Sequence, residues 1–292
     1  MAEALQLLIS GIATGTIYAL PAIGFVLLWQ TTGTINFAQG EFVMLPSIIM
    51  LAFIIFGDMP LWVSFLLTLA ISAMLLGSVF KVVVVQPMIR HGVLPLIIAT
   101  IALSILMRET AKEFFWNEAQ AFPMPVPYIV IRMGEVTVTT HHLFSFGVAC
   151  ALVILLQWFL SRTRTGRSMQ AVAQNPDTAA ILGINVQRMI SLAFLINAGL
   201  VTVAAVLVTP IYLAKWDNGI AIGLTAFIAA IIGGFNQVRG AILGGVLVGV
   251  LENFSAFYIS TEYRAAFPLI LLIAVILFRP YGLLGRPEER TV

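Results

Sequence analysis

The stretch MAEALQLLISGIATGTIYALPAIGFVLLW at residues 1–29 decides the class of fold, because it is apolar over almost its whole length. A helix of about 20 consecutive apolar residues crosses the hydrocarbon core of a bilayer, which is about 30 Å thick. The stretch has no basic segment at its start, and its apolar run is too long for a cleavable signal peptide. We therefore expect residues 4–29 to form the first transmembrane helix.

The rest of the 292-residue chain has the same character. Hydrophobic residues make up 60% and charged residues 10% of it, whereas soluble domains carry about 25% charged residues. The sequence predicts an all-α polytopic membrane protein with about 8–10 membrane segments in one transmembrane domain, residues 1–292. The stretches 41–57, 93–107 and 219–235 are short for a full crossing, so we expect some of them to be tilted, broken or re-entrant. The other segments are 61–82, 143–160, 190–212, 238–258 and 263–278.

Basic residues gather in two places. The loop at 161–167 contains Arg162, Arg164 and Arg167, and the C-terminal tail contains Arg279, Arg286 and Arg290. Because cytoplasmic loops of membrane proteins carry an excess of Lys and Arg, we expect this loop and the C-terminus to lie in the cytoplasm. The formal net charge of +2 gives no indication of a nucleic-acid partner.

Residues 108–142 are predicted to form an extracytoplasmic loop. Alternating residues in YIVIR and EVTVTT flank Met133-Gly134, which is a plausible turn, so we expect a short β-hairpin on the outer surface. His141 and His142 follow the second strand. Adjacent residues of an extended strand point in opposite directions, so we expect a solvated histidine pair and no metal site.

The pattern GxxNxxxG occurs twice, at Gly33, Asn36 and Gly40 and at Gly233, Asn236 and Gly240. Transporters often contain repeats whose helix breaks line the transport pathway, although a chance match is the alternative. Glu41 and Glu252 are the main carboxylates within membrane segments, and each could instead be hydrated at a helix end. The candidate pathway residues are Tyr18, Asn36, Gln39, Glu41 and Asn236.

Motifs for catalysis are missing from the sequence. A phosphate-binding loop needs Gly-Lys-Ser/Thr, but Phe80, Ala111 and Ala214 precede the three lysines at 81, 112 and 215. The apolar segments also lack the series of ionisable groups typical of ion-coupled carriers. We therefore expect a protein that is not an enzyme, needs no cofactor or metal, and is driven by an energy source outside this chain.

The polar stretch QAVAQNPDTAAILGINVQR at 170–188 follows the arginine-rich loop. Asn175 can cap a helix that starts at Pro176, and Gly183 suits the left-handed position that ends one. We expect a helix-turn-helix over 161–189 that couples the chain to a partner by inserting small and apolar residues into its groove; a loop packed on its own chain is the alternative. The candidate coupling residues are Ala171, Asn175, Pro176, Ala179, Ala180, Ile181, Gly183 and Ile184.

The sequence resembles a known family in four stretches, at 11–45, 162–186, 224–252 and 279–285, the last reading RPYGLLG. The family is that of the permease subunits of ABC importers for branched-chain amino acids, of the LivH type. The resemblance implies an ABC importer transmembrane domain in the bacterial inner membrane, with 162–186 docking on an ATP-binding subunit. It also implies a homologous second permease, two ATP-binding subunits and an extracytoplasmic solute-binding protein, in addition to membrane lipid.

Gln39 departs from the family, which commonly has histidine in the motif NFAHG where this chain has NFAQG. If this position contacts substrate, the departure puts a branched-chain substrate in doubt. The same architecture carrying urea, short amides or another small solute is therefore one alternative, and a self-sufficient secondary carrier or channel is another.

Overall fold

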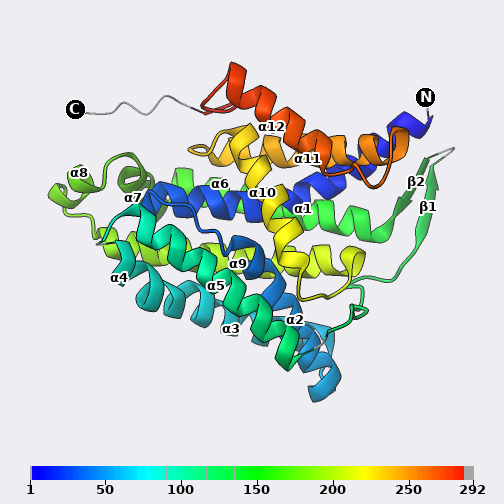
Figure 1. The fold of residues 1–292 in the computed structure, drawn as a ribbon, viewed down its shortest axis with the longest axis horizontal. Coiled ribbons are helices and arrows are strands. Elements are labelled where there is room, and N and C mark those ends of the chain that lie inside the picture. Colours follow the sequence, from blue (N-terminus) through cyan, green and yellow to red (C-terminus); the bar gives the residue numbers. More distant parts are fainter. Residues whose placement is uncertain (1, 90, 116, 134–135, 286–292) are drawn as a thin grey trace. The chain divides into compact units, whose positions relative to one another are not determined.

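The computed structural model describes residues 2–89, 91–115, 117–133 and 136–285. Within this part of the chain, seven helices are long and apolar enough to cross a membrane (Figure 1). The predicted all-α polytopic fold is confirmed. The seven are α1 (Ala2–Thr32), α2 (Gln39–Gly57), the run from α3 (Leu61–Ser72) to α4 (Gln86–Ile89), α5 (Val93–Phe114), α6 (Thr140–Arg162), α9 (Val186–Tyr212) and α11 (Val238–Tyr258).

Two further apolar helices are shorter. These are α10 (Asn218–Gly233), with 16 residues, and α12 (Ala266–Phe278), with 13. The prediction of a short segment at 219–235 is therefore confirmed, but the segments at 41–57 and 93–107 belong to the full-length α2 and α5. Residues 108–114, predicted to lie in the outer loop, form the last turns of α5. Their charges, among them Arg108, end the apolar run before the helix ends.

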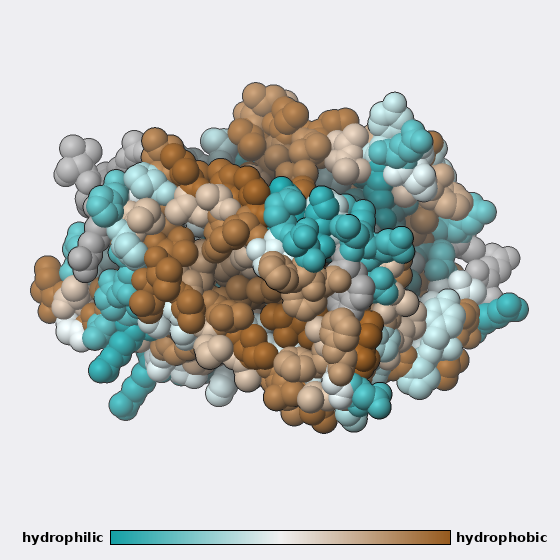
Figure 2. All heavy atoms as spheres, turned by 60° about the horizontal axis from the view of Figure 1, so that its bottom comes forward, coloured by the Kyte–Doolittle hydropathy of each residue, from teal (hydrophilic) through white to brown (hydrophobic). Residues whose placement is uncertain are grey.

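Helix α3, at the start of the α3–α4 run, has its polar residues on a buried face. Ser64, Thr68 and Ser72 lie four residues apart on one face of α3 and are buried, whereas Trp62 and Leu66 are exposed. This inverts the pattern of a soluble protein and suits a helix whose outer face meets lipid. Figure 2 shows a face of the protein on which apolar side chains predominate.

The chain packs as two compact units. Unit 1 takes residues 1–26, 126–150 and 224–292, and unit 2 takes residues 27–125 and 151–223. Helices α1, α6 and α10 each begin in one unit and end in the other.

In unit 1, glycines bring α1 and α11 into backbone contact. A Cβ atom placed on Gly15 would lie 2.6 Å from the Cα of Val246, and one on Gly11 would lie 2.6 Å from the Cα of Val250. Small residues allow membrane helices to approach so closely that dispersion contacts hold them together. Glycines at these positions therefore let α1 and α11 pack backbone to backbone.

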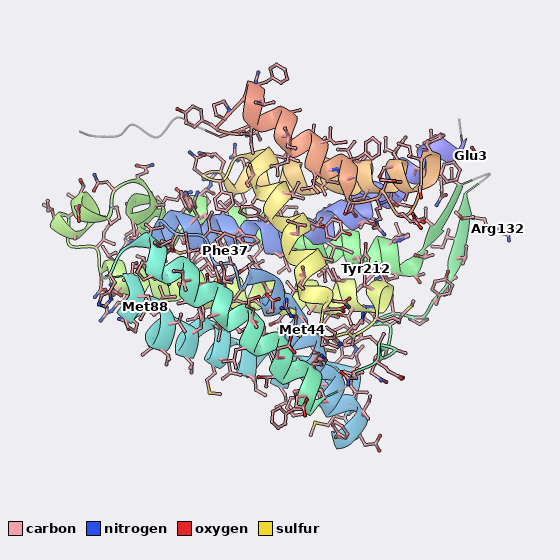
Figure 3. All side chains as sticks on the ribbon, in the orientation of Figure 1. Glu3, Phe37, Met44, Met88, Arg132 and Tyr212 are labelled. Carbon is pink, nitrogen blue, oxygen red and sulfur yellow. The ribbon has the colours of Figure 1, made fainter. Side chains whose placement is uncertain are left out.

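A two-stranded antiparallel sheet lies in unit 1, with β1 (Val130–Met133) and β2 (Val136–Thr139) in register from Val130↔Thr139 to Met133↔Val136. This confirms the predicted hairpin; Gly134 of the predicted turn lies outside the described residues. The side chain of Gln6 accepts a hydrogen bond from the backbone N–H of Thr137 at 2.7 Å and donates one to its carbonyl. Figure 3 shows Glu3, near the start of α1, and Arg132, on strand β1, at the same end of unit 1.

The prediction of a solvated histidine pair is wrong for His141. Helix α6 begins at Thr140, so both histidines lie on a helix rather than on an extended strand. The helix turns His141 inward, where it is buried with its Nε2 atom 3.4 Å from the Ser145 hydroxyl, while His142 is half-buried.

Unit 2 has an aromatic core between α2, α9 and the α3–α4 run. The rings of Phe42 and Phe80 meet edge-on at 4.9 Å, and those of Phe80 and Phe194 lie 5.6 Å apart. Phe80 lies between two wide π-helical segments, η1 (Ala73–Val79) and η2 (Lys81–Val85). Gly77 of η1 packs directly on Leu195, so the widened helix rests against α9.

Candidate coupling segment and translocation residues

The predicted coupling segment forms two helices, α7 (Arg164–Gln174) and α8 (Pro176–Ile181), both in unit 2. The Asn175 side chain accepts a hydrogen bond from the backbone N–H of Thr178 at 2.9 Å, and Pro176 occupies the first position of α8. The cap and the proline are therefore as predicted from sequence, because both follow from local backbone chemistry.

The end of α8 also follows the prediction. Gly183 has φ +82°, in the left-handed region. Its N–H donates to the carbonyl of Ala180 at 2.9 Å, and the N–H of Ile184 donates to the carbonyl of Ala179 at 3.0 Å. These two bonds are the Schellman pattern, which satisfies the last carbonyls of a helix and sets the direction in which the chain leaves it.

The predicted coupling residues differ in their exposure. Ala179 is only 2% exposed, so its side chain is covered by its own chain and cannot enter a partner's groove in this conformation. Successive residues of a helix point in different directions. In α8 the Ala179 side chain points toward the protein, and the side chains that follow it point outward. Ile181 and Leu182 are 85% and 73% exposed. Ala180 is exposed as well, and Ala171 and Ile184 are half-buried.

The segment is held firmly to the transmembrane helices of unit 2. A Cβ atom on Gly166 of α7 would lie 2.6 Å from the Cα of Leu160 in α6, so the two backbones touch. After the turn, the Asn185 side chain accepts from the N–H of Arg188 at 3.0 Å and caps α9. The exposed residues Ile181 and Leu182 are therefore carried by a segment that is packed against α6 and leads directly into α9.

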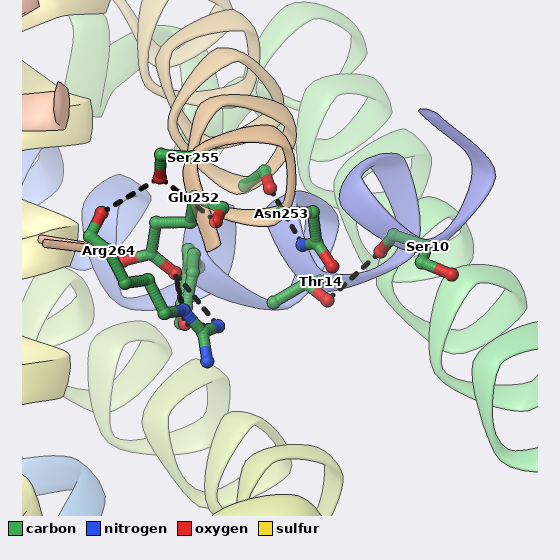
Figure 4. Close-up of polar contacts among 8 residues, drawn as sticks. Ser10, Thr14, Glu252, Asn253, Ser255 and Arg264 are labelled. Atoms are coloured by element: carbon green, nitrogen blue, oxygen red, sulfur yellow. Dashed lines mark hydrogen bonds and ion pairs between the residues drawn. The ribbon is translucent and has the colours of Figure 1, made fainter. Parts of the chain in front are cut away.

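In unit 1, Tyr18 belongs to a buried polar cluster with Glu252 and Arg264, both of which Figure 4 labels. Its hydroxyl donates to Glu252 Oε2 at 2.9 Å. Arg264, in the link between α11 and α12, donates to the same oxygen from Nε at 3.2 Å and from Nη2 at 3.0 Å. The Ser255 hydroxyl donates to the carbonyls of Glu252 and Arg264 at 3.1 and 3.3 Å. Glu252 is thus a buried, paired carboxylate, and not one hydrated at a helix end.

In unit 2, Gln39 and Asn197 form a reciprocal amide pair between α2 and α9. Gln39 Nε2 donates to Asn197 Oδ1 at 2.7 Å, and Asn197 Nδ2 donates to Gln39 Oε1 at 3.0 Å. Both side chains are fully buried. Glu41, in the first turn of α2, is buried too, and Ser104 hydrogen-bonds to it.

Both GxxNxxxG segments are breaks between two helices, as the repeat predicts. In unit 2 the break joins α1 to α2, and in unit 1 it joins α10 to α11. The second break is closed by the C-terminal RPYGLLG segment, in which the N–H groups of Leu283 and Leu284 donate to the carbonyls of Ile232 and Gly233, both at 2.9 Å. Asn236 is half-buried in this break.

The first break contains a small pocket beside Asn36, with a mostly apolar lining. The Asn36 side chain accepts a hydrogen bond from the N–H of Ala38 at 3.1 Å, which forms a local turn. The residues that line the pocket come from the break, from the C-terminal end of α1, from the first turns of α5, from the π-helical run and from α9. They are Leu28, Thr32, Thr34, Ile35, Asn36, Phe80, Val85, Leu96, Thr100 and Phe194.

Sequence reasoning missed Asn197, Thr100 and Arg264. Asn197 is a single amide in the apolar run 190–212, which is a usable signal because an amide in a membrane helix needs a partner. Arg264 stands in a short link beside the intramembrane Glu252, so charge pairing could have indicated it. Among the described residues, no group of three or more His, Cys, Asp or Glu is arranged to hold a metal ion.

Comparison with known proteins gives matches along nearly the whole chain. The family model described as the permease component of a branched-chain amino acid transport system matches residues 7–276. The high-affinity branched-chain amino acid transport system permease protein BraD of Pseudomonas aeruginosa is 34% identical over 301 residues, 99% of this chain and 98% of that protein. The corresponding permease protein LivH of Escherichia coli strain K12 is 32% identical over 303 residues, 99% of this chain and 97% of that protein.

One solved structure also aligns with most of the chain. PsaBC from Streptococcus pneumoniae in complex with Fab matches 98% of this chain and 93% of that chain, at 14% identity and a TM-score of 0.49. This similarity is too distant for a detailed comparison of the two folds.

Proposed function

This chain belongs to the family of permease components of branched-chain amino acid transport systems, and we propose that it lines the translocation pathway of an ATP-driven importer for branched-chain or other hydrophobic amino acids. The multi-pass helical fold suits such a role. The sequence has no nucleotide-binding loop of its own. The chain would therefore carry the solute while partner subunits hydrolyse ATP.

The observation that carries the proposal is the exposed apolar tip of the coupling segment. Ile181 and Leu182 are both more than two-thirds exposed at the end of α8, beyond the long apolar helices. Large apolar side chains exposed on a rigid helical support are typical of helix-in-groove recognition. We propose that this pair enters a groove of an ATP-binding subunit, with Asn175, Pro176 and Gly183 fixing the geometry of the tip.

The same segment offers a route for coupling ATP hydrolysis to transport. Movement of α8 would pass through the capped start of α9 and along that helix to Asn197, whose amide is bonded to Gln39 of α2. A reciprocal pair of buried amides transmits displacement well, because separating the helices would leave both amides without partners. Helix α2 would then move with the coupling segment and change access along the pathway.

The complex that we propose has a homologous second permease, two ATP-binding subunits and an extracytoplasmic solute-binding protein in the bacterial inner membrane. The coupling segment and the C-terminus would face the cytoplasm, since Arg162, Arg164 and Arg167 precede or start the segment. The β-hairpin would then lie on the outer side, at the end where Gln6 of α1 is bonded to it.

The pairing of Gln39 bears on the substrate. Its amide is fully buried and exchanges two hydrogen bonds with Asn197 within unit 2. We propose that Gln39 serves this helix-helix contact, so that its departure from the family's histidine does not argue against a hydrophobic amino acid. The names of the relatives, both branched-chain amino acid permeases, support this substrate class.

The proposal is tested by introducing a charge at the apolar tip. Ile181→Asp and Leu182→Asp should each reduce co-purification of the ATP-binding subunit and lower ATP-driven leucine uptake at least tenfold, because burying an unpaired carboxylate costs several kcal/mol, about 3 or more. Ile129→Asp is the matched control, since Ile129 is also apolar and exposed but lies outside the coupling segment. Wild-type co-purification and uptake in both tip variants would contradict the proposal.

A further inference from the structure

Asn36 has one hydrogen-bond donor that the protein leaves unused. The side chain is 6% exposed. Its Oδ1 atom accepts from the N–H of Ala38 at 3.1 Å, which fixes the orientation of the amide, since the reversed amide would place two donors against each other. Its Nδ2 atom is buried and has no hydrogen-bond partner in the part of the chain that the structure describes. A buried donor without an acceptor costs about 1–3 kcal/mol.

The pocket beside this donor is small, and its lining is mostly apolar with a few polar side chains. Its volume is about 10 Å³, close to the 10–15 Å³ that one water molecule needs. Thr34 and Thr100 bring hydroxyl groups to the lining, while Phe80 and Phe194 close the apolar side. The Thr100 hydroxyl is itself held in place, because it donates to the carbonyl of Ile97 at 2.9 Å and accepts from the N–H of Phe37 at 3.3 Å.

We propose that this pocket is a binding site for one oxygen atom that accepts a hydrogen bond from Asn36 Nδ2. An acceptor is required because the group that lacks a partner is an N–H donor. An oxygen atom is favoured by the pocket, which admits one atom of that size and has hydroxyl groups beside the amide. The site lies in the break between α1 and α2, where the chain is not helical.

Two molecules could supply such an oxygen. One is a water molecule, which would remain in the break at all times. The other is the carboxylate of an amino acid in transit, and this source rests on the proposed function. A carboxylate oxygen binds more strongly than water to an amide donor because its bond is charge-assisted, so the pocket would then hold the solute by its charged end.

The decisive experiment is a high-resolution structure of the complete transporter, determined once without solute and once with leucine. We expect density for one oxygen at about 2.7–3.2 Å from Asn36 Nδ2. Density present in both structures identifies water, and density that continues into a leucine molecule identifies the carboxylate. An empty pocket in both structures overturns the proposal.

Variants separate the two sources in function. Asn36→Asp keeps the acceptor for the Ala38 N–H but replaces the Nδ2 donor with an oxygen of a negative group. A buried carboxylate lowers the melting temperature of the complex in either case, so the leucine concentration at half-maximal uptake is measured below that temperature. With water in the pocket, this concentration should stay within twofold of wild type even if the maximal rate falls, because water can donate to the new carboxylate. With a substrate carboxylate, it should rise at least tenfold, because like charges repel.

Asn117→Asp is the matched control, since Asn117 is exposed and the same change of charge there should leave uptake unaltered. Leucine uptake by the wild-type complex tests the proposed function on its own. A wild-type complex that does not carry leucine but shows the oxygen density would therefore refute the amino-acid substrate and leave the oxygen site standing.

Discussion

Replacing Arg264 with Gln should destabilise unit 1 more than replacing Glu252 with Gln, although both changes break the same ion pair. The Glu252 side chain is 5% exposed, whereas that of Arg264 is 34% exposed. After Arg264→Gln, a carboxylate remains buried in a membrane helix without its counter-ion. After Glu252→Gln, the remaining charge is the partly exposed Arg264 guanidinium. The loss of its partner should therefore lower the free energy of unfolding less.

The structure sets the expected magnitudes. Removing one partner of a buried ion pair lowers the free energy of unfolding by about 3–5 kcal/mol. After Arg264→Gln, the Tyr18 hydroxyl still donates to Glu252 at 2.9 Å. We therefore expect a loss near the lower end of this range, about 3 kcal/mol. Glu252→Gln keeps the shape and an acceptor, so about 1 kcal/mol is expected. The double variant removes both charges, so it should be more stable than Arg264→Gln alone.

Cys150 provides the assay. It is the single cysteine of the chain and is half-buried in α6, within unit 1. A thiol-reactive fluorophore should label it as the unit unfolds during heating of the transporter, assembled with cysteine-free partners. Arg132→Gln on the exposed strand β1 is the control for loss of an arginine. Equal stability of the two single variants, or a double variant less stable than Arg264→Gln, would refute the reasoning.

Three further predictions concern the coupling segment and the helix contacts. Gly183→Val should uncouple ATP hydrolysis from uptake, because a side chain at φ +82° costs about 1–3 kcal/mol; Gly183→Asn should be milder, and equal activity of the two would contradict the account. Gln39→Ala should lower stability by about 1–3 kcal/mol by leaving the Asn197 amide unpaired, with less effect when Asn197 is also replaced by Ala, as a double-mutant cycle would measure. Gly15→Leu should prevent α1 from packing on α11, because even a Cβ atom would lie 2.6 Å from Val246 Cα, and normal yield and melting temperature would argue against this contact.

The features that could be predicted from sequence are local ones. Asn175, Pro176 and Gly183 lie within nine residues of one another, and each acts on the backbone beside it, so capping rules were sufficient to define α8. The membrane helices were predictable for a similar reason, because length and hydropathy alone decide whether a segment can span a bilayer.

The pairings across the fold were not predictable in the same way. The Tyr18 hydroxyl meets a carboxylate 234 positions later, and Gln39 meets an amide 158 positions later. Which polar groups meet depends on how helices rotate and cross, and one apolar sequence is compatible with several such arrangements. The inward orientation of Ala179 was missed for a related reason, since a helix of six residues has too little periodicity to show which face is buried.

The central claim is tested most directly by measuring leucine uptake in proteoliposomes. With the second permease, the ATP-binding subunits and the solute-binding protein present, uptake should require ATP and should stop when the ATP-binding subunits are omitted. This chain alone, under a proton or sodium gradient, should carry no leucine. Gradient-driven uptake by the purified chain alone would contradict the account and identify a self-sufficient carrier.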